Sequence, residues 1–115
     1  IEEATELMLD LLSKPSKQRP DAIFANDDLL ATGVLMAAKK LNISVPDKLG
    51  IVGFGDLSFA SWLTPRLTSV VQNGRLVGHN AGSQLLKYIA GEISQLESSI
   101  IDTELVIRES SLRIG

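Results

Sequence analysis

The chain has 115 residues, of which 44% are hydrophobic and 22% charged, a composition typical of one globular domain rather than a disordered segment. The formal net charge of −3 argues against an extended nucleic-acid surface, because such surfaces depend on clustered Lys and Arg. No apolar run approaches the roughly 20 residues of a membrane span, and without cysteine there is no disulfide framework, thiolate nucleophile or cysteine-based metal site.

A first helix is predicted over residues 2–13, where leucine and methionine recur at helical spacing. Because Ile1 opens the chain without a methionine and leads directly into this pattern, we expect the chain to begin inside a larger protein. No signal-like segment is visible. The basic residues between positions 14 and 19 are flanked by prolines, so they are predicted to form a solvated loop rather than a DNA contact.

Residues 21–25 are predicted to form a short apolar strand, and the next helix is predicted to begin at Asp28. A carboxylate at Asp28 can accept from the free amide groups of the first helical turn, which makes it the expected N-cap and leaves Asp27 available for a ligand. Apolar side chains at three- and four-residue spacing continue the helix as far as Leu41. Asn42 is the expected left-handed stop, because its short polar side chain tolerates positive φ.

A turn over residues 45–47 leads into a second strand, residues 49–54, which is apolar enough to be covered on both faces. Strand, helix and strand in this order predict a right-handed parallel crossover. Residues 67–71 are predicted to form a third strand.

The remaining chain predicts a long helix over residues 75–90, closed by Gly91, and a last strand over residues 104–109. Beside the apolar stripe of this helix, a glycine recurs every fourth residue from Gly74 to Gly82. These small residues favour close packing of a neighbouring helix, although they lower the intrinsic stability of the helix itself.

Two loops fall where a ligand would bind. In an open parallel sheet, ligands bind outside the carboxyl ends of the strands, and the loops at residues 26–28 and 55–56 both follow predicted strands. We therefore expect these loops to line one crevice. Asp56 is also expected to cap a short helix over residues 57–62.

Catalysis, nucleotide binding and metal binding are disfavoured. The glycines of residues 53–55 suggest a dinucleotide loop only weakly, since Ser58 replaces the third glycine and the pattern follows a helix. His79 is the only histidine and has no serine or carboxylate motif beside it. Asp27 and Asp28 lie side by side at a helix start and point in different directions, which does not suit a metal ion. We expect no catalytic residue, metal or cofactor.

Large apolar side chains gather in the loop that precedes the third strand, at Phe59, Trp62 and Leu63. Aromatic residues are enriched both in protein cores and at subunit contacts. Two interpretations therefore stay open, a local core and a contact between subunits.

A resemblance to a known family rests on seven segments: AIF at 22–24, NDD at 26–28, VPD at 45–47, IVGF at 51–54, LTPRLTSV at 63–70, VG at 77–78 and LVIRES at 105–110. In this order and spacing, and nearly from end to end, the chain resembles the C-terminal part of a lactose-repressor (LacI-type) regulator. Free-standing periplasmic sugar-binding proteins share that fold but usually lack the LTP segment.

The resemblance implies an α/β fold of the type I periplasmic-binding-protein kind, a parallel sheet flanked by helices, present here as an incomplete fragment. Residues 1–71 and 104–115 would belong to the C-terminal lobe of an effector-binding domain, and the helix at 75–91 to the N-terminal lobe. Roughly the last third of such a protein would be present. We expect the helix at 75–91 to lack packing partners here.

The resemblance also implies roles for single residues that match positions of the family. Phe24 would pack on the effector and Asp27 would be a polar effector contact. Gln72 would lie near the cleft, where the chain crosses between lobes. Gly55 departs from the aspartate that many sugar-binding members place there. The NDD and GFGD segments instead resemble the gluconate-repressor branch. Loss of a carboxylate at Gly55 would relieve repulsion of an anionic sugar acid.

The family's dimer face would include residues of the helix from Asp28 and of the aromatic loop: Thr32, Leu35, Met36, Phe59, Trp62 and Leu63. The chain is thus expected to come from a non-enzymatic, cytoplasmic, homodimeric regulator with a small sugar or sugar-acid effector and no membrane partner. Operator DNA would be reached only through an N-terminal headpiece outside this sequence. The alternative is a solute-binding protein for transport, which an upstream signal peptide would indicate.

Overall fold

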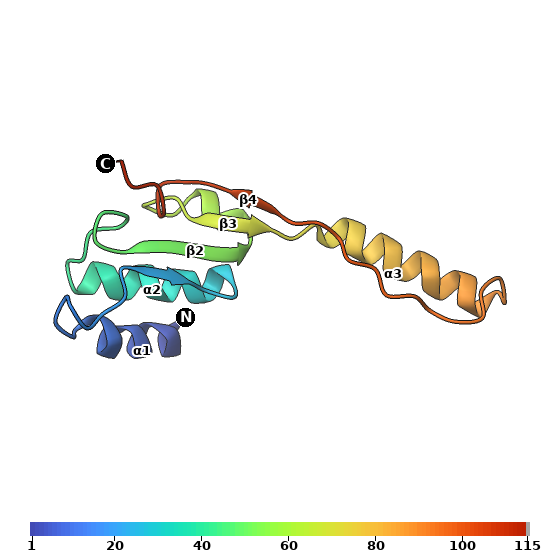
Figure 1. Ribbon diagram of the computed structural model, residues 1–115, viewed down its shortest axis with the longest axis horizontal. Coiled ribbons are helices and arrows are strands. Elements are labelled where there is room, and N and C mark those ends of the chain that lie inside the picture. Colours follow the sequence, from blue (N-terminus) through green and yellow to red (C-terminus); the bar gives the residue numbers. More distant parts are fainter. Residues whose placement is uncertain (115) are drawn as a thin grey trace. The chain divides into compact units, whose positions relative to one another are not determined.

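The computed structural model describes residues 1–114. The chain divides into two compact units, unit 1 with Ile1–Val71 and the segment from Leu105 onward, and unit 2 with Gln72–Glu104. Figure 1 shows the elements, which are in chain order α1 (Glu2–Leu12), β1 (Ala22–Phe24), α2 (Asp28–Lys40), β2 (Gly50–Gly55), the short 3-10 helix η1 (Ser58–Ser61), β3 (Thr68–Val71), α3 (Gly74–Ile89) and β4 (Glu104–Val106).

The four strands form one sheet in the order β1-β2-β3-β4. β1, β2 and β3 are parallel, with Ile23 opposite Ile51 and Val52 opposite Thr68. Since α2 connects β1 to β2, this pairing confirms the predicted parallel crossover. β2 is well buried, as its apolar sequence predicted, because it lies between two other strands.

The core of unit 1 lies between the sheet and its helices. α2 packs against β2, and α1 packs against α2. At that second contact a Cβ on Gly33 would lie 2.7 Å from the Cβ of Ala4, so only glycine allows the two helices to approach this closely. The largest apolar side chains that are fully buried are Leu12, Leu49, Ile51 and Leu67.

The left-handed helix stop predicted at Asn42 is confirmed by its φ of +54°, and Gly91 follows α3 with a φ of +75°. The strand predicted over 104–109 is wrong beyond Val106. Beyond Val106 the regular pattern is interrupted, because the Arg108 amide donates to the side-chain hydroxyl Oγ1 of Thr68 at 2.8 Å and not to a backbone carbonyl. The side chain of Thr68 therefore ends the regular ladder.

Residues 107–111 form a return segment that runs antiparallel to β3. Arg108 bonds to Thr68, and the amide of Ser110 donates to the carbonyl of Arg66 at 2.9 Å, so the partner numbers fall as the segment advances. Ser110 is fully buried, and its hydroxyl donates to the carbonyl of Ile51 while accepting from the amide of Thr68. The return segment is thus tied to two different strands of unit 1.

Unit 2 consists of α3 and the segment that follows it. No residue of α3 is buried, and its apolar stripe, with Val77, Leu85 and Ile89, is exposed. The close helix contact expected at Gly74, Gly78 and Gly82 is not made within unit 2, where a Cβ on any of them would meet open space. As expected, α3 has few partners in the described chain. Within residues 1–114, no helix has the length and apolarity needed to cross a bilayer.

Candidate functional site

The carboxyl ends of β1 and β2 lie beside each other in unit 1, as the parallel register requires. Phe24 ends β1 with 63% of its surface exposed, an unusual position for a phenylalanine. The chain then enters α2 through Asp27, while β2 continues into the β2 loop, Gly55–Leu57. The two predicted ligand loops are therefore neighbours.

Asp27, not Asp28, caps α2. The Oδ1 atom of Asp27 accepts from the amide of Leu30 at 2.6 Å, and its backbone is extended, as is usual for an N-cap. The helix begins at Asp28 as predicted, but the expectation that Asp28 caps it is wrong, because the N-cap is the residue that precedes the first helical residue. Asp27 is half-buried, and its Oδ2 atom takes no part in the cap.

Asp28 is fully buried and joins the two loops. Its Oδ2 accepts from the amide of Leu57 at 2.7 Å, and its Oδ1 accepts from the hydroxyl of Ser69 at 2.6 Å. These bonds compensate part of the cost of burying a carboxylate, and the N-terminal end of α2 adds a favourable dipole. A Cβ on Gly53 would lie only 2.2 Å from Asp28 Oδ1. The glycine is therefore needed to make room for the buried carboxylate, which explains it without a dinucleotide.

The β2 loop has two successive residues in the left-handed region. Gly55 has a φ of +116° and Asp56 a φ of +48°. A side chain on Gly55 would have room but would be strained, because L-residues rarely adopt this conformation. An aspartate could not replace Gly55 here without a change in the backbone.

Asp56 does not cap η1, which corrects the expectation. The N-cap of η1 is Leu57, without a side-chain bond. The Oδ1 of Asp56 instead accepts from Arg108 Nη1 at 2.7 Å, and the amide of Asp56 donates to Ser69 Oγ at 3.0 Å. The side chains of both ion-pair partners are largely buried.

Gln72 is the first residue of unit 2 and is exposed. It directly follows Val71, the register partner of Gly55 at the end of β3. The structure thus brings Phe24, Asp27 and Gly55 to one end of the sheet in unit 1, and the chain places Gln72 one residue beyond it.

An apolar groove of about 570 Å³ lies between α2 and the loop after η1. Trp62 is 81% exposed, so the local-core interpretation of this residue is wrong. Phe59 is half-buried and does not line the groove. The other five residues expected at a dimer contact all line it: Thr32, Leu35, Met36, Trp62 and Leu63.

A second ion pair joins the return segment to the loop before β3. The carboxylate of Glu109 accepts from both the amide and the Nε of Arg66, at 2.9 and 3.1 Å. The backbone hydrogen bond from Arg66, followed by the side-chain bond, lowers the pKa of Glu109. Both side chains are at least half exposed, unlike those of Asp56 and Arg108.

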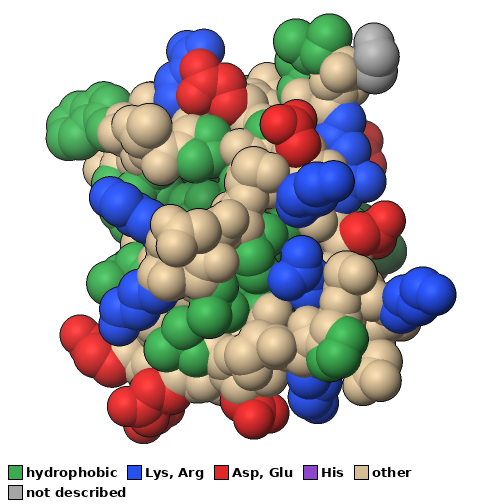
Figure 2. Space-filling model, turned by 90° about the vertical axis from the view of Figure 1, so that its left-hand side faces the viewer, with side chains coloured by type: hydrophobic (Ala, Val, Ile, Leu, Met, Phe, Trp, Pro, Cys, Tyr) green, Lys and Arg blue, Asp and Glu red, His purple; other side chains and the backbone are tan. Residues whose placement is uncertain are grey.

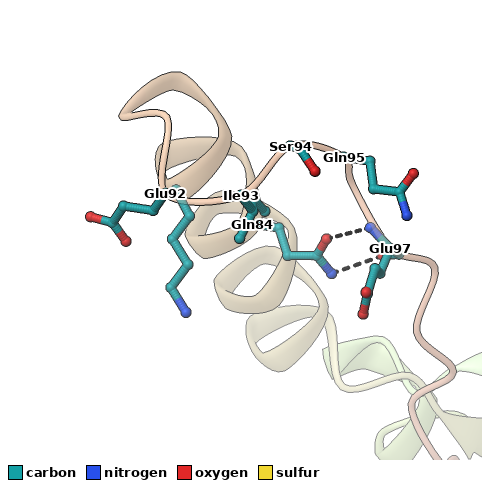
Figure 3. A pocket seen from close by; sticks show the side chains of 7 residues that line it. Gln84, Glu92, Ile93, Ser94, Gln95 and Glu97 are labelled. Atoms are coloured by element: carbon teal, nitrogen blue, oxygen red, sulfur yellow. Dashed lines mark hydrogen bonds between the residues drawn. The ribbon is translucent and has the colours of Figure 1, made fainter.

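Unit 2 has a polar hollow of about 500 Å³ beside α3 (Figure 3). There the amide of Gln84 makes two bonds of 2.8 Å with the backbone of Glu97, one to the carbonyl and one from the amide. These bonds hold the segment after α3 and use the polar groups of the Gln84 side chain. His79 is exposed on α3, as predicted.

Charges of both signs are interspersed over unit 1. The face shown in Figure 2 carries Lys and Arg among acidic, neutral and apolar groups rather than as a continuous basic surface. Within residues 1–114, no group of three His, Cys, Asp or Glu residues is arranged to hold a metal ion.

Sequence reasoning missed Ser69, Arg108 and Ser110 as part of this architecture. Each bonds to a residue more than 40 positions away, so no local pattern could indicate the contact. The available signal was indirect: a charged arginine inside an apolar strand pattern needs a partner.

Comparisons with known proteins agree with this geometry. Residues 1–111 match the family described as periplasmic binding protein-like domain. The chain is 34% identical over 110 residues to the HTH-type transcriptional repressor CytR of Escherichia coli K12, covering 96% of this chain and 32% of that protein. It is 35% identical over 108 residues to the HTH-type transcriptional regulator GntR of Pseudomonas aeruginosa, covering 92% and 30%.

Among solved structures, a LacI family transcriptional regulator from Lactobacillus casei with bound sucrose has a TM-score of 0.82 and 30% identity. The match covers 96% of this chain and 40% of that one. The chain thus spans 30% to 32% of the two curated relatives named above. These similarities confirm the predicted fold class.

Proposed function

The chain belongs to the family of periplasmic binding protein-like domains, in the form found in LacI-type transcriptional regulators, and we propose that it senses a small sugar or sugar acid. The observation that carries the proposal is that Asp28 joins the loops at the carboxyl ends of β1 and β2, at the same end of the sheet as the exposed Phe24 and the half-buried Asp27. Ligands of open parallel sheets bind at such ends.

Each proposed contact has a distinct chemical task. The ring of Phe24 offers an apolar face on which the C–H groups of a sugar can pack. Asp27 can accept hydrogen bonds from sugar hydroxyls through Oδ2, since Oδ1 is engaged in the cap. Gln72 supplies an amide that both donates and accepts. Gly55 contributes only backbone to the proposed site.

The proposed mechanism is a shift between two arrangements of lobes. We assign unit 1 to the C-terminal lobe and the helix at 75–91 to the N-terminal lobe. An effector that binds one arrangement better than the other changes their populations. In a dimeric, cytoplasmic regulator, that shift would alter how paired headpieces fit two operator half-sites. A solute-binding protein for transport shares the fold, but neither curated relative named above is described as one.

A sugar acid is the favoured effector class. Gly55 contributes no carboxylate, Asp28 is buried, and Asp56 is neutralised by Arg108, so Asp27 is the acid left to face a ligand from these loops. The similarity to GntR agrees with the resemblance of the NDD and GFGD segments to the gluconate-repressor branch. Fewer free carboxylates mean less repulsion of an anion.

Calorimetric titration of the intact protein with gluconate, glucose and sucrose tests the proposal. We expect gluconate to bind most tightly, and Phe24→Ala to weaken binding about tenfold, equivalent to about 1.4 kcal/mol. Leu7→Ala on α1 is the control, because Leu7 is equally exposed at 64% and lies away from the strand ends. Absence of binding by all three compounds, or unchanged affinity in Phe24→Ala, would refute the proposed site.

A further inference from the structure

Asp56 is bonded to one residue from each of the two chain segments that connect unit 1 to unit 2. Ser69 lies two residues before the end of β3, and its hydroxyl accepts from the Asp56 amide at 3.0 Å. Arg108 lies two residues after β4, and its Nη1 donates to Asp56 Oδ1 at 2.7 Å. β3 leads into Gln72–Glu104, and β4 leads out of it. The β2 loop is therefore bonded at a single residue to both connections.

The bonds of Arg108 fix its position as well as its charge. Its Nη1 also donates to the carbonyl of Leu67 at 2.7 Å, and its backbone amide donates to Thr68 Oγ1. The side chain of Arg108 is 16% exposed and that of Asp56 22% exposed, so water screens this pair only partly. A shift of the return segment must therefore either move Asp56 or break a shielded ion pair.

From these contacts we propose that Asp56 and Arg108 are positioning residues. They make the conformation of the β2 loop depend on the positions of the two segments that connect unit 1 to unit 2. This deepens the proposed function, on which it rests, by naming the place where a rearrangement of the connections reaches the ligand loop. Neither side chain needs to touch the effector. Gly55 directly precedes Asp56 in the chain, so a displacement of Asp56 also displaces the backbone of Gly55.

Two amides report on this arrangement without any ligand. The Asp56 amide is bonded to Ser69 and the Leu57 amide to Asp28, so both exchange with solvent only when the β2 loop opens. Hydrogen exchange of the intact protein, followed by mass spectrometry of peptides covering residues 55–63, measures that opening. We expect Arg108→Gln to accelerate exchange there about tenfold or more, the loss expected for a hydrogen bond between charged groups.

The Arg66–Glu109 pair provides the matched control. It joins the return segment to the loop before β3, but it is exposed and does not contact Asp56. Arg66→Gln should therefore leave exchange at residues 55–63 nearly unchanged. If Arg108→Gln exchanges no faster than Arg66→Gln, the positioning role is refuted.

Conservative variants separate positioning from general stability. Arg108→Lys retains a charged donor and should restore most of the protection, and Asp56→Asn keeps a residue type that tolerates positive φ while removing the charge. If the two residues act as a pair, Asp56→Asn with Arg108→Gln should open the loop no more than the larger of the two single changes. Additive effects would overturn the pairing, and Asp56→Asn decides the question should Arg108→Gln fail to fold.

Titration with gluconate, glucose and sucrose links the pair to sensing. For whichever compound the wild type binds, Arg108→Gln should weaken binding about tenfold, Arg108→Lys should recover it, and Arg66→Gln should bind normally. Equal affinities in Arg108→Gln and Arg66→Gln would contradict the coupling. If the wild type binds none of the three, the proposed function fails, whereas the exchange data still decide whether Arg108 positions the β2 loop.

Discussion

Asp27 and Asp28 are adjacent carboxylates that perform different tasks because they face opposite surroundings. Asp27 stays half-buried at the start of α2 and satisfies a free helix amide. Asp28 turns into the protein, where it accepts from Leu57 and Ser69. Substitutions at the two positions should therefore separate in their effects on stability and on ligand binding.

Asp28→Asn should destabilise the intact protein by about 1 to 3 kcal/mol. The side-chain NH2 group of the asparagine would face either the Leu57 amide or the Ser69 hydroxyl, and that donor would lose its acceptor. Urea denaturation measures the change, with Asp47→Asn as an exposed control of the same chemistry. Equal midpoints for the two variants would show that the bonds of Asp28 contribute little.

Asp27→Ala should cost roughly 1 kcal/mol through loss of the helix cap, and should also weaken effector binding about tenfold. Asp27→Ser separates the two effects, since serine caps well but has a single side-chain oxygen. We expect Asp27→Ser to recover the melting temperature and not the affinity. If Asp27→Ser binds the effector with normal affinity by calorimetry, Oδ2 of Asp27 is not a ligand contact.

At the scale of elements, the return segment, which follows the short strand β4, makes several of the contacts that hold unit 1 together. Ser110 and Arg108 connect it to β2, β3 and the β2 loop through side-chain hydrogen bonds, beside the backbone bonds of Ser110. Glu109 adds a link to Arg66 on the surface. These links make the segment a junction of elements that are distant in sequence.

The Glu109 link should make stability depend on pH. Because the folded pKa of Glu109 is lowered, its contribution is fully present above the unfolded pKa and is lost as pH falls through the folded pKa. Glu109→Gln should thus be less stable than wild type at neutral pH, and the difference should vanish in acid. Thermal melts across the acidic range measure it, with Glu104→Gln as an exposed control. A difference that persists in strong acid would assign the effect to packing.

At the scale of the whole molecule, the apolar groove is the part of unit 1 best suited to a second subunit. Met36 and Trp62 are exposed on its two sides, one from α2 and one from the loop after η1. Large aromatic side chains of this kind are enriched at the centres of protein interfaces. We propose that a second copy of the chain covers this groove.

Met36→Glu should weaken dimerisation of the intact protein at least about tenfold, because a carboxylate would be buried without a partner. Analytical ultracentrifugation over a range of concentrations measures the shift toward monomer. Leu7→Glu places the same charge on an exposed apolar site of α1 and should leave the dimer intact. If both variants dimerise like wild type, another surface forms the contact.

The sequence by itself determined the order of helices and strands, the parallel crossover and the family, because these depend on local periodicity and on motifs at fixed spacing. It also indicated that the loops after β1 and β2 would meet, since parallel strands end on the same side. Tertiary structure alone decided which carboxylate faces inward, where β4 ends and which arginine neutralises Asp56. Asp56 and Arg108 are 52 residues apart, and such a pairing is set by how the strands pack, which no local pattern contains.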